Sequence, residues 1–396
     1  MKKLLSINLM LLLIISLGAC SIKDTSIPTD FDTSDDTISE VNTSAEATSL
    51  SDTSSLDNEN SVSSVYSSMP TYIEEITRPV EISVTISALG DCALGKLSIH
   101  GYSGSFNNYY DNYGADYFFS GVQEIIGQDD FTLANLECVL SESDDLVEKA
   151  YNIKGHPEYA SILTAGSIEG VTLGNNHTFD YGEQSHEDTI DAVLSQGLDY
   201  AFNDHYGIYT TEDGITIGYV SSNLCPNYTD GSEEYLKEGV IALKEQDVDI
   251  IIACPHWGIE KEHYPTEDQK TLGHELIDLG ADLIIGNHTH VLQGIEYYNG
   301  KIICYSLANF CFGANMHPYE TKTAIYQQTF TFVDGVMQDD LTANIVPCLI
   351  TSTSGGNDFC PTIATKSWQT IIDNMNTYSS GLSNVHFEDD GTITLN

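Results

Sequence analysis

Five short polar clusters in this chain contain side chains that can bind a metal ion or transfer a proton. They are Gly90-Asp91, Asn135-Leu136-Glu137, Gly174-Asn175-Asn176-His177, Pro255-His256-Trp257-Gly258 and Gly286-Asn287-His288-Thr289-His290. Their carboxylates, amide oxygens and imidazoles suit Mn, Fe, Zn or Mg to differing degrees. Two such ions about 3.5–4 Å apart can activate a water molecule and stabilise a developing oxyanion.

Each cluster taken alone also has a structural interpretation. A Gly-Asp pair after a strand is usually a turn, and Asn175 and Asn176 could be turn residues with positive φ. Asn135 could form a turn or a surface pair with Glu137, and His256 could be a packed histidine. The ordered set of five is more specific than any member, so we expect a metal or anion site.

The elements that must position these clusters follow from the pattern of apolar residues. The expected strands cover 81–89, 131–134, 170–173, 248–253 and 282–285, and one polar cluster follows each of them. Sites in α/β sheets form at the carboxyl ends of strands, where loops bring distant residues together. We therefore expect the five clusters to converge in one crevice.

Helices are expected between these strands. The pattern predicts them over 157–165, over 183–196 and from the capping-box spacing at Thr266 to Gly280. Asn299-Gly300 predicts a hairpin turn, and the C-terminal part favours further hairpins and a helix near Trp368. This alternation of strands and helices is typical of an α/β fold.

The charge of the chain excludes some classes of partner. Its 396 residues include 59 acidic and 14 basic side chains, which gives a formal net charge of -45. Nucleic-acid binding needs Lys and Arg to neutralise phosphates, so we expect no nucleic-acid partner. The acidic surface either maintains solubility or gathers divalent cations, and the charge alone does not separate these two interpretations.

The N-terminus predicts export and a lipid anchor. Residues 1–20 have a basic start, an apolar stretch and then Leu17-Gly18-Ala19-Cys20, which resembles a lipobox with Cys20 as the lipidated residue. An ordinary signal peptide or an N-terminal membrane helix is the alternative. The protein is therefore expected outside the cytoplasm, anchored by lipid to the outer face of the cell membrane.

Composition divides the rest of the chain. Residues 21–78 are rich in Ser, Thr, Asp and Glu and are expected to form a disordered tether. The main domain is expected over 79–350, with a C-terminal extension over 351–396 packed on it. Eight cysteines follow Cys20, but no C-x-x-C occurs and some lie in apolar runs, so no disulfide framework is predicted.

The order of the five clusters, followed by Tyr305-Ser306-Leu307-Ala308-Asn309-Phe310, resembles the CapA family. That family is named for bacterial poly-γ-glutamate capsule synthesis and belongs to the metallophosphatase-like superfamily. The most telling runs are residues 174–182 and 305–310, and the resemblance covers about 82–312. It implies a four-layer α/β sandwich of two β-sheets flanked by helices, with the site at the sheet edges.

The resemblance also implies roles for individual residues and a cofactor of one or two divalent ions (Mn, Fe or Zn). Asp91 would bind one metal with His290, and Asn176 and His256 would bind the other with His288. Glu137, helped by Asn135, would take the bridging position. The expected catalytic residues are His177, as general acid or charge stabiliser, and the ligand Asp91.

Two departures from the superfamily pattern matter, and a third change is minor. Ala93 stands where the first motif, Asp-x-His, has its histidine, and Asn135-Leu136-Glu137 replaces Gly-Asp-x-x-Asp. Ala308 stands where the family commonly has glycine. One metal position therefore loses a ligand, so the site is expected to hold one metal, to hold two loosely, or to use different chemistry.

The resemblance implies a role in synthesis or export of a capsule or cell-envelope polymer of the poly-γ-glutamate type. One hypothesis is a metal-dependent hydrolase or transferase acting on that polymer. A second is a non-catalytic accessory protein that binds an anionic polymer or its synthase complex, and a third is a nucleotidase-like metallophosphoesterase. The expected partners are the polymer or synthase, and the membrane through the lipid anchor.

Overall fold

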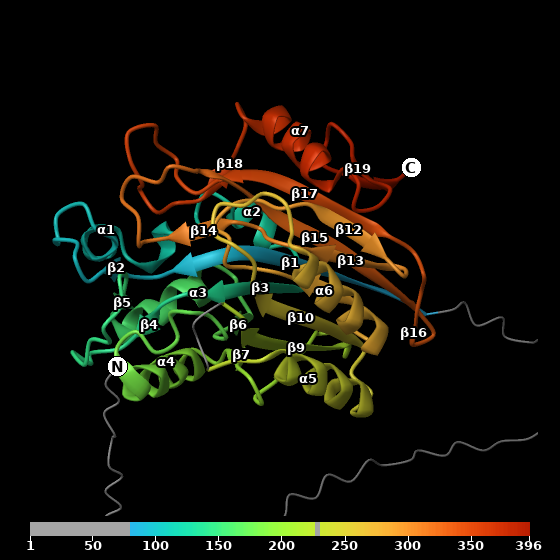
Figure 1. Cartoon of the computed structure of the whole chain (residues 1–396), viewed down its shortest axis with the longest axis horizontal. Coiled ribbons are helices and arrows are strands. Elements are labelled where there is room, and N and C mark those ends of the chain that lie inside the picture. Colours follow the sequence, from blue (N-terminus) through green and yellow to red (C-terminus); the bar gives the residue numbers. More distant parts are fainter. Residues whose placement is uncertain (1–79, 226–229) are drawn as a thin grey trace, which may run out of the picture. The chain divides into compact units, whose positions relative to one another are not determined.

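The computed structural model describes residues 80–225 and 230–396 of the chain. The predicted signal peptide, Cys20 and the tether lie outside these residues. In the described part, two large β-sheets pack face to face with helices on their outer faces (Figure 1). No helix in this part is long and apolar enough to cross a membrane.

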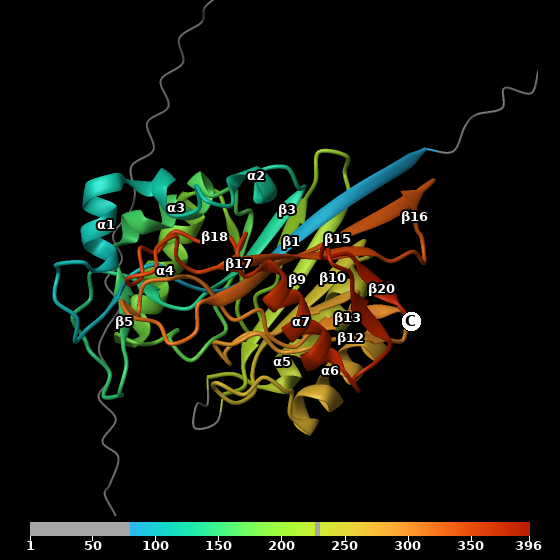
Figure 2. The same ribbon diagram turned by 90° about the horizontal axis from the view of Figure 1, so that it is seen from above.

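The larger sheet has nine strands and contains three of the five clusters at or just after strand ends. Its strand order is β18 (Thr362–Ile363), β17 (Thr342–Leu349), β15 (Lys322–Val333), β1 (Glu81–Ala93), β3 (Phe131–Leu136), β6 (Gly170–Thr172) and β7 (Asp199–Ala201), with β14 (Asn309–Phe312) paired to β1 and β16 (Val336–Met337) paired to β15. The central strand β1 runs parallel to β3 and β14 and antiparallel to β15, and Figure 2 shows β1 and β15 side by side.

The smaller sheet has six strands and carries the other two clusters. Its order is β12 (Ile295–Tyr298), β13 (Lys301–Cys304), β11 (Leu283–Ile285), β10 (Ile250–His256), β9 (Thr216–Asn223) and β8 (Gly207–Thr210). Strands β9, β10, β11 and β13 are mutually parallel, so their carboxyl ends meet at one edge. Two small sheets pair β2 (Lys96–Leu97), β5 (Ile153–Gly155) and β4 (Val139–Leu140), and β19 (Val385–Phe387) with β20 (Ile393–Leu395).

The α-helices of the described residues lie outside the two sheets. They are α1 (Phe106–Tyr113), α2 (Gln123–Ile126), α3 (Ser161–Ala165), α4 (Gly182–Ser195), α5 (Glu233–Glu245), α6 (Glu267–Leu279) and α7 (Trp368–Ser379), with 3-10 turns at η1 (Ala115–Tyr117) and η2 (Pro157–Ala160). Helix α6 begins with the predicted capping box, because the Thr266 side chain accepts from the Gln269 amide and the Gln269 side chain accepts from the Thr266 amide. Gly280 follows its last turn, as expected.

Alternation of side chains along the strands produces the four layers that the resemblance implied. Leu133 of β3 points into the core between the sheets, whereas its neighbour Ala134 packs toward α1–α4. Ile252 of β10 likewise faces the core between the sheets, and Ile251 faces α5 and α6. The order is helices, larger sheet, smaller sheet, helices, which confirms the expected α/β sandwich. Helix α7 adds apolar side chains to the core between the sheets.

Several expected elements differ in detail from the observed ones. The helix expected over 157–165 is a 3-10 turn, η2, followed by the short α3. Strands β1 and β10 run further than predicted, so Asp91 and His256 lie inside the strands at their carboxyl ends. Between Gly197 and Val248, where no element is expected from the pattern of apolar residues, the structure has β7, β8, β9 and α5.

Candidate metal centre

The five polar clusters meet at the edge where the two sheets come together. Asp91 and Glu137 come from β1 and from the residue after β3, and the loop after β6 brings Asn176 and His177. The smaller sheet contributes His256 at the end of β10, and His288 and His290 in the loop after β11. A further strand end, that of β9, adds Cys225, which the sequence analysis had not named as a candidate.

The first group of potential ligands, here called the carboxylate cluster, consists of Asp91, Glu137 and His290. His290 Nδ1 lies 3.2 Å from Asp91 Oδ2 and 3.9 Å from Glu137 Oε2. One ligand atom from each of the three residues lies within 4.8 Å of the others, a spacing that can hold one ion. The structure thus brings together Asp91 and His290, the pair expected to share a metal.

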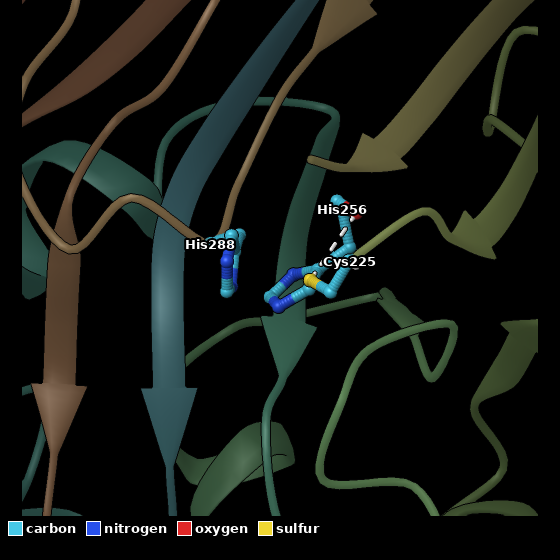
Figure 3. Close-up of side chains that lie close together, drawn as sticks. All are labelled: Cys225, His256 and His288. Carbon is cyan, nitrogen blue, oxygen red and sulfur yellow. Dashed lines mark hydrogen bonds between the residues drawn. The ribbon is translucent and has the colours of Figure 1, made fainter. Parts of the chain in front are cut away.

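The second group, here called the thiol–imidazole cluster, consists of Cys225, His256 and His288 (Figure 3). Their ligand atoms also lie within 4.8 Å of one another, and the two imidazole ring centres are 4.9 Å apart. Asn176 Oδ1 lies 2.8 Å from His256 Nε2. The structure therefore also brings together Asn176, His256 and His288, which were expected to share the other metal.

Glu137 lies between the two clusters. Its Oε1 is 3.5 Å from His256 Nε2, whereas its Oε2 faces His290. Both carboxylate oxygens are buried and accept no hydrogen bond, and the buried Nδ1 of His288 has no hydrogen-bond partner either. A buried polar atom without a partner costs free energy, and a divalent cation would satisfy all three. The residues present therefore fit a metal-binding site with Glu137 as a bridging carboxylate.

The electrostatics of the centre agree with this fit. Burial raises the pKa of Glu137 well above its ordinary value, and the Asp91 charge raises it further. Burial lowers the pKa of His290, but Glu137 and Asp91 outweigh it and raise that pKa to about 10. Burial, and then His288, lower the pKa of His256. The buried carboxylates thus favour positive charge at the centre, as a cation-binding site requires.

Asn135 occupies a different position from the one expected of a metal ligand. Its Oδ1 accepts hydrogen bonds from Thr172 Oγ1 (3.1 Å) and Asn175 Nδ2 (3.2 Å). Its Nδ2 donates to Asp91 Oδ1 at 2.8 Å. The amide oxygen is therefore engaged, and in this arrangement Asn135 orients Asp91 instead of offering an oxygen to an ion.

His177 has the surroundings of a proton-transfer residue. Its Nδ1 lies 2.7 Å from Asp180 Oδ2, and its Nε2 is directed toward Glu137 Oε1 at 3.9 Å. Lys149 pairs with the other oxygen of Asp180 and donates to the Asn176 carbonyl oxygen at 2.7 Å. Burial lowers the pKa of His177, while Asp180 raises it. Asp180 thus fixes the imidazole with Nε2 toward the centre of the site.

The loops that carry the ligands adopt uncommon backbone conformations. His288 and His290 have φ of 93° and 58°, and Ala308, beside the site, has φ of 66°. Such angles are rare for residues other than glycine and cluster at functional sites. A glycine at position 308, which the resemblance implied, would adopt such an angle without strain. The Asp91 amide donates to the Ala308 carbonyl oxygen at 2.8 Å, which ties this loop to β1.

A cavity of about 560 Å³ opens onto the centre. Its lining includes Lys149, Tyr151, Asn176, His177, Lys261, His290, Asn309 and Tyr319. Tyr151 and Tyr319 are 60% and 63% exposed, so aromatic side chains stand at its surface. A substrate in this cavity would meet His177, His290 and Lys261, and Glu260 also lines it.

Ala93, where the resemblance led us to look for a histidine ligand, packs in the apolar core on the α1–α4 side of the larger sheet. It is fully buried and offers no ligand. His290 Nδ1 does lie 2.8 Å from Asn309 Oδ1, so an amide oxygen stands close to the carboxylate cluster. Asn309 belongs to the run 305–310 on which the resemblance rests. No local sequence pattern indicated that its side chain lies beside His290.

Comparisons with solved structures return proteins of low similarity. A Thermus thermophilus protein, TT1561, has 9% identity and a TM-score of 0.35, covering 62% of this chain and 94% of that one. The purple acid phosphatase PPD1 from yellow lupin seeds has 9% identity and a TM-score of 0.33, covering 71% of this chain and 53% of that one.

Curated relatives are more similar in sequence. The PGA biosynthesis protein CapA of Bacillus subtilis (strain 168) is 30% identical over 219 residues, which are 50% of this chain and 57% of the relative. The capsule biosynthesis protein CapA of Bacillus anthracis is 28% identical over 253 residues, 58% of this chain and 60% of the relative. A probable polyglutamine synthesis accessory protein of Mycobacterium tuberculosis is 26% identical over 204 residues, 44% of this chain and 54% of the relative.

The chain thus spans somewhat over half the length of these relatives. A family model described as bacterial capsule synthesis protein PGA_cap matches residues 85–314, which is more than half of the chain and includes every residue of both clusters. The chain therefore belongs to the bacterial capsule synthesis protein family PGA_cap.

Proposed function

We propose that this protein is a surface lipoprotein that acts in synthesis or export of a cell-envelope polymer of the poly-γ-glutamate type, as a metal-dependent hydrolase or transferase. Family membership supports the link to capsule synthesis. The lipobox-like sequence before Cys20 supports anchoring to the outer face of the cell membrane. If the anchor is correct, Cys20→Ser moves the protein from the membrane fraction to the soluble fraction; unchanged fractionation contradicts it.

The observation that carries the catalytic part is the position of Glu137. Its two unpartnered oxygens face two separate clusters of buried potential ligands. Buried carboxylates normally accept hydrogen bonds, so their lack of partners here favours cation binding over a structural role. A divalent ion held there would act as a Lewis acid. It would lower the pKa of a bound water molecule, so that hydroxide is available as a nucleophile at neutral pH.

The residues around the clusters provide the remaining functions of a hydrolase or transferase. His177 Nε2 faces the centre and can deliver a proton to a leaving group, while Asp180 holds its Nδ1. Lys261 lines the cavity and can contact the carboxylates or phosphates of an anionic substrate. The proposed partners are therefore an anionic polymer or its lipid-linked precursor, and the synthase complex that makes it.

Elemental analysis of the full-length protein tests the metal centre. We expect about two divalent ions per chain after loading with Mn, Fe or Zn, and loss of metal in Asp91→Ala and His288→Ala. The loaded protein is then assayed on phosphoesters, lipid-linked precursors and γ-glutamyl polymers. Metal-loaded protein without turnover on any of these would contradict the catalytic proposal, and absence of metal would contradict the centre itself.

A second function, a polymer-binding accessory protein without catalysis, is favoured by one observation. Ala93 occupies the superfamily's histidine position and packs in the apolar core, so the carboxylate cluster lacks that ligand. A polymer complex that persists in His177→Ala, with no turnover by the unmodified protein, would favour this function. Turnover that is abolished by His177→Ala would exclude it.

A further inference from the structure

Cys225 is a buried cysteine whose thiol lies beside two histidines of the candidate metal centre. It follows β9, with a backbone amide that donates to Asn223 Oδ1 at 3.1 Å, and its side chain is directed toward His256 and His288 (Figure 3). Cys225 is 4% exposed, and its thiol donates a hydrogen bond to the His256 carbonyl oxygen at 3.7 Å. Cys254, by comparison, packs among apolar side chains between the sheets.

A second observation at the same place points to a ligand. His288 is 6% exposed, and its Nδ1 is buried without a hydrogen-bond partner. The ligand atoms of Cys225, His256 and His288 lie within 4.8 Å of one another, so the unpartnered imidazole nitrogen and the sulfur share one small space. Asn176 Oδ1, 2.8 Å from His256 Nε2, adds an oxygen at its edge.

We propose that Cys225 is a metal ligand and that the thiol–imidazole cluster forms a position selective for a thiophilic ion, Zn²⁺ rather than Mn²⁺. The inference rests on the proposed metal centre and adds a ligand and a metal preference to it. As the ion binds, the sulfur–metal bond replaces the S–H bond and the proton passes to solvent. The carboxylate cluster, with two carboxylates and one imidazole, remains the position for a harder ion.

The donor types account for this asymmetry. Thiolate sulfur is a soft donor that selects Zn²⁺ over Mn²⁺, whereas carboxylate and carbonyl oxygens suit Mn²⁺ and Mg²⁺. Zinc binds thiolate sulfur and imidazole nitrogen in tetrahedral geometry. The two positions that Glu137 connects therefore differ in chemistry, although both lie at the same sheet edge.

The test uses Cd²⁺ and Zn²⁺ with the full-length protein. Cd²⁺ bound to a thiolate gives an ultraviolet charge-transfer band, so the loaded protein is expected to show this band, and Cys225→Ala to lose it. Cys254→Ala is the matched control and should retain it. Competition with a chelator should show that Cys225→Ala weakens Zn²⁺ binding at one position by at least about tenfold, because even outer-shell partners contribute 10–100-fold.

The outcomes separate this inference from the proposed function. Two bound ions without a thiolate band, or a band that persists in Cys225→Ala, overturn the role of Cys225 but leave the metal centre intact. No bound metal overturns both. Circular dichroism checks that Cys225→Ala is folded. If it is not folded, His288→Ala serves as the second variant and should also lose the band. A band that persists in His288→Ala contradicts the thiol–imidazole cluster as a metal site.

Discussion

At the residue scale, the proposed proton transfer depends on how His177 is held. Asp180 lies 2.7 Å from its Nδ1 and pairs with Lys149 as well. Such an acceptor keeps the proton of neutral imidazole on Nδ1, which leaves Nε2 free to accept a proton. It also stabilises the imidazolium that forms when Nε2 is protonated. Asp180 is therefore a positioning residue whose effect should appear in kcat.

We expect Asp180→Asn to lower kcat by about 10²–10⁴-fold, which is the range of general acid–base catalysis. Metal content should not change, because Asp180 belongs to neither cluster. Asp188→Asn is the control, since Asp188 accepts from Ser141 and Gln184 away from the clusters. Equal turnover by both variants would contradict the positioning role.

Gly90 allows β1 to approach the loop that contains Ala308. A Cβ atom at Gly90 would lie 1.9 Å from the Ala308 carbonyl oxygen, which also accepts the Asp91 amide. We expect Gly90→Ala to lower the free energy of unfolding by about 1–3 kcal/mol, as overpacking does, and to weaken metal binding by displacing Asp91. Urea unfolding and metal titration measure both effects.

Gly101→Ala is the matched control, because a Cβ at Gly101 meets no atom within 4 Å. It should leave stability and metal binding close to those of the unmodified protein. If the two glycine variants behave alike, the contact between β1 and the Ala308 loop does not hold Asp91 in place.

At the element scale, local signals made some of the structure predictable and left other parts hidden. The capping box at Thr266 and the Asn299-Gly300 turn depend on neighbouring residues, so the sequence predicts both, and the structure confirms them. Strand β9 was missed, and with it the strand end that brings Cys225 to His256. That contact joins residues that follow or end two different strands, and no sequence motif around Cys225 indicates it.

The sequence placed the ligands at strand ends but could not assign their individual hydrogen bonds. Which oxygen of Glu137 faces which histidine, and the engagement of the Asn135 amide, depend on how the two sheets meet. The same holds for Asp180 and Lys149, which lie in or beside loops and contact the site only after folding. Tertiary packing, rather than any local pattern, decides these contacts.

Strands β3 and β6 are joined by a half-buried acid, Glu169, whose charge should affect stability. Glu169 Oε2 accepts from the Thr132 amide at 2.7 Å, and burial raises the pKa of Glu169 from 4.5 to about 7. The folded state therefore binds this proton more tightly than the unfolded state does. The resulting stabilisation is fully present below about pH 4.5 and is lost as the pH rises through about 7.

We expect Glu169→Gln to remove this pH dependence, because the amide can keep its oxygen on Thr132 without acquiring a charge. Relative to the variant, the unmodified protein should lose on the order of 1 kcal/mol between about pH 5 and about pH 8, allowing for partial solvent exposure of Glu169. Urea unfolding of both proteins at the two pH values measures the difference. Parallel pH profiles would show that Glu169 does not titrate in this range.

At the scale of the whole molecule, the proposed anionic substrate would have to reach a site on a protein of formal net charge -45. Long-range repulsion slows the encounter, whereas the lysines in the cavity act only over short distances. The Debye length falls from about 30 Å at 0.01 M salt to about 8 Å at 0.15 M, so salt screens the repulsion before it affects contacts inside the cavity. The association rate should therefore depend on salt more strongly than the dissociation rate does.

We expect the association rate of a γ-glutamyl oligomer to rise as ionic strength increases from about 0.01 M to 0.15 M. Lys261→Gln should instead increase the dissociation rate, because Lys261 lines the cavity. Lys237→Gln is the control: Lys237 pairs with Glu233 and Glu275 on α5 and α6 and should affect retention little. Stopped-flow binding measures both rates. An association rate that falls with added salt would mean that local positive charge controls the approach, and that the acidic surface does not oppose an anionic partner.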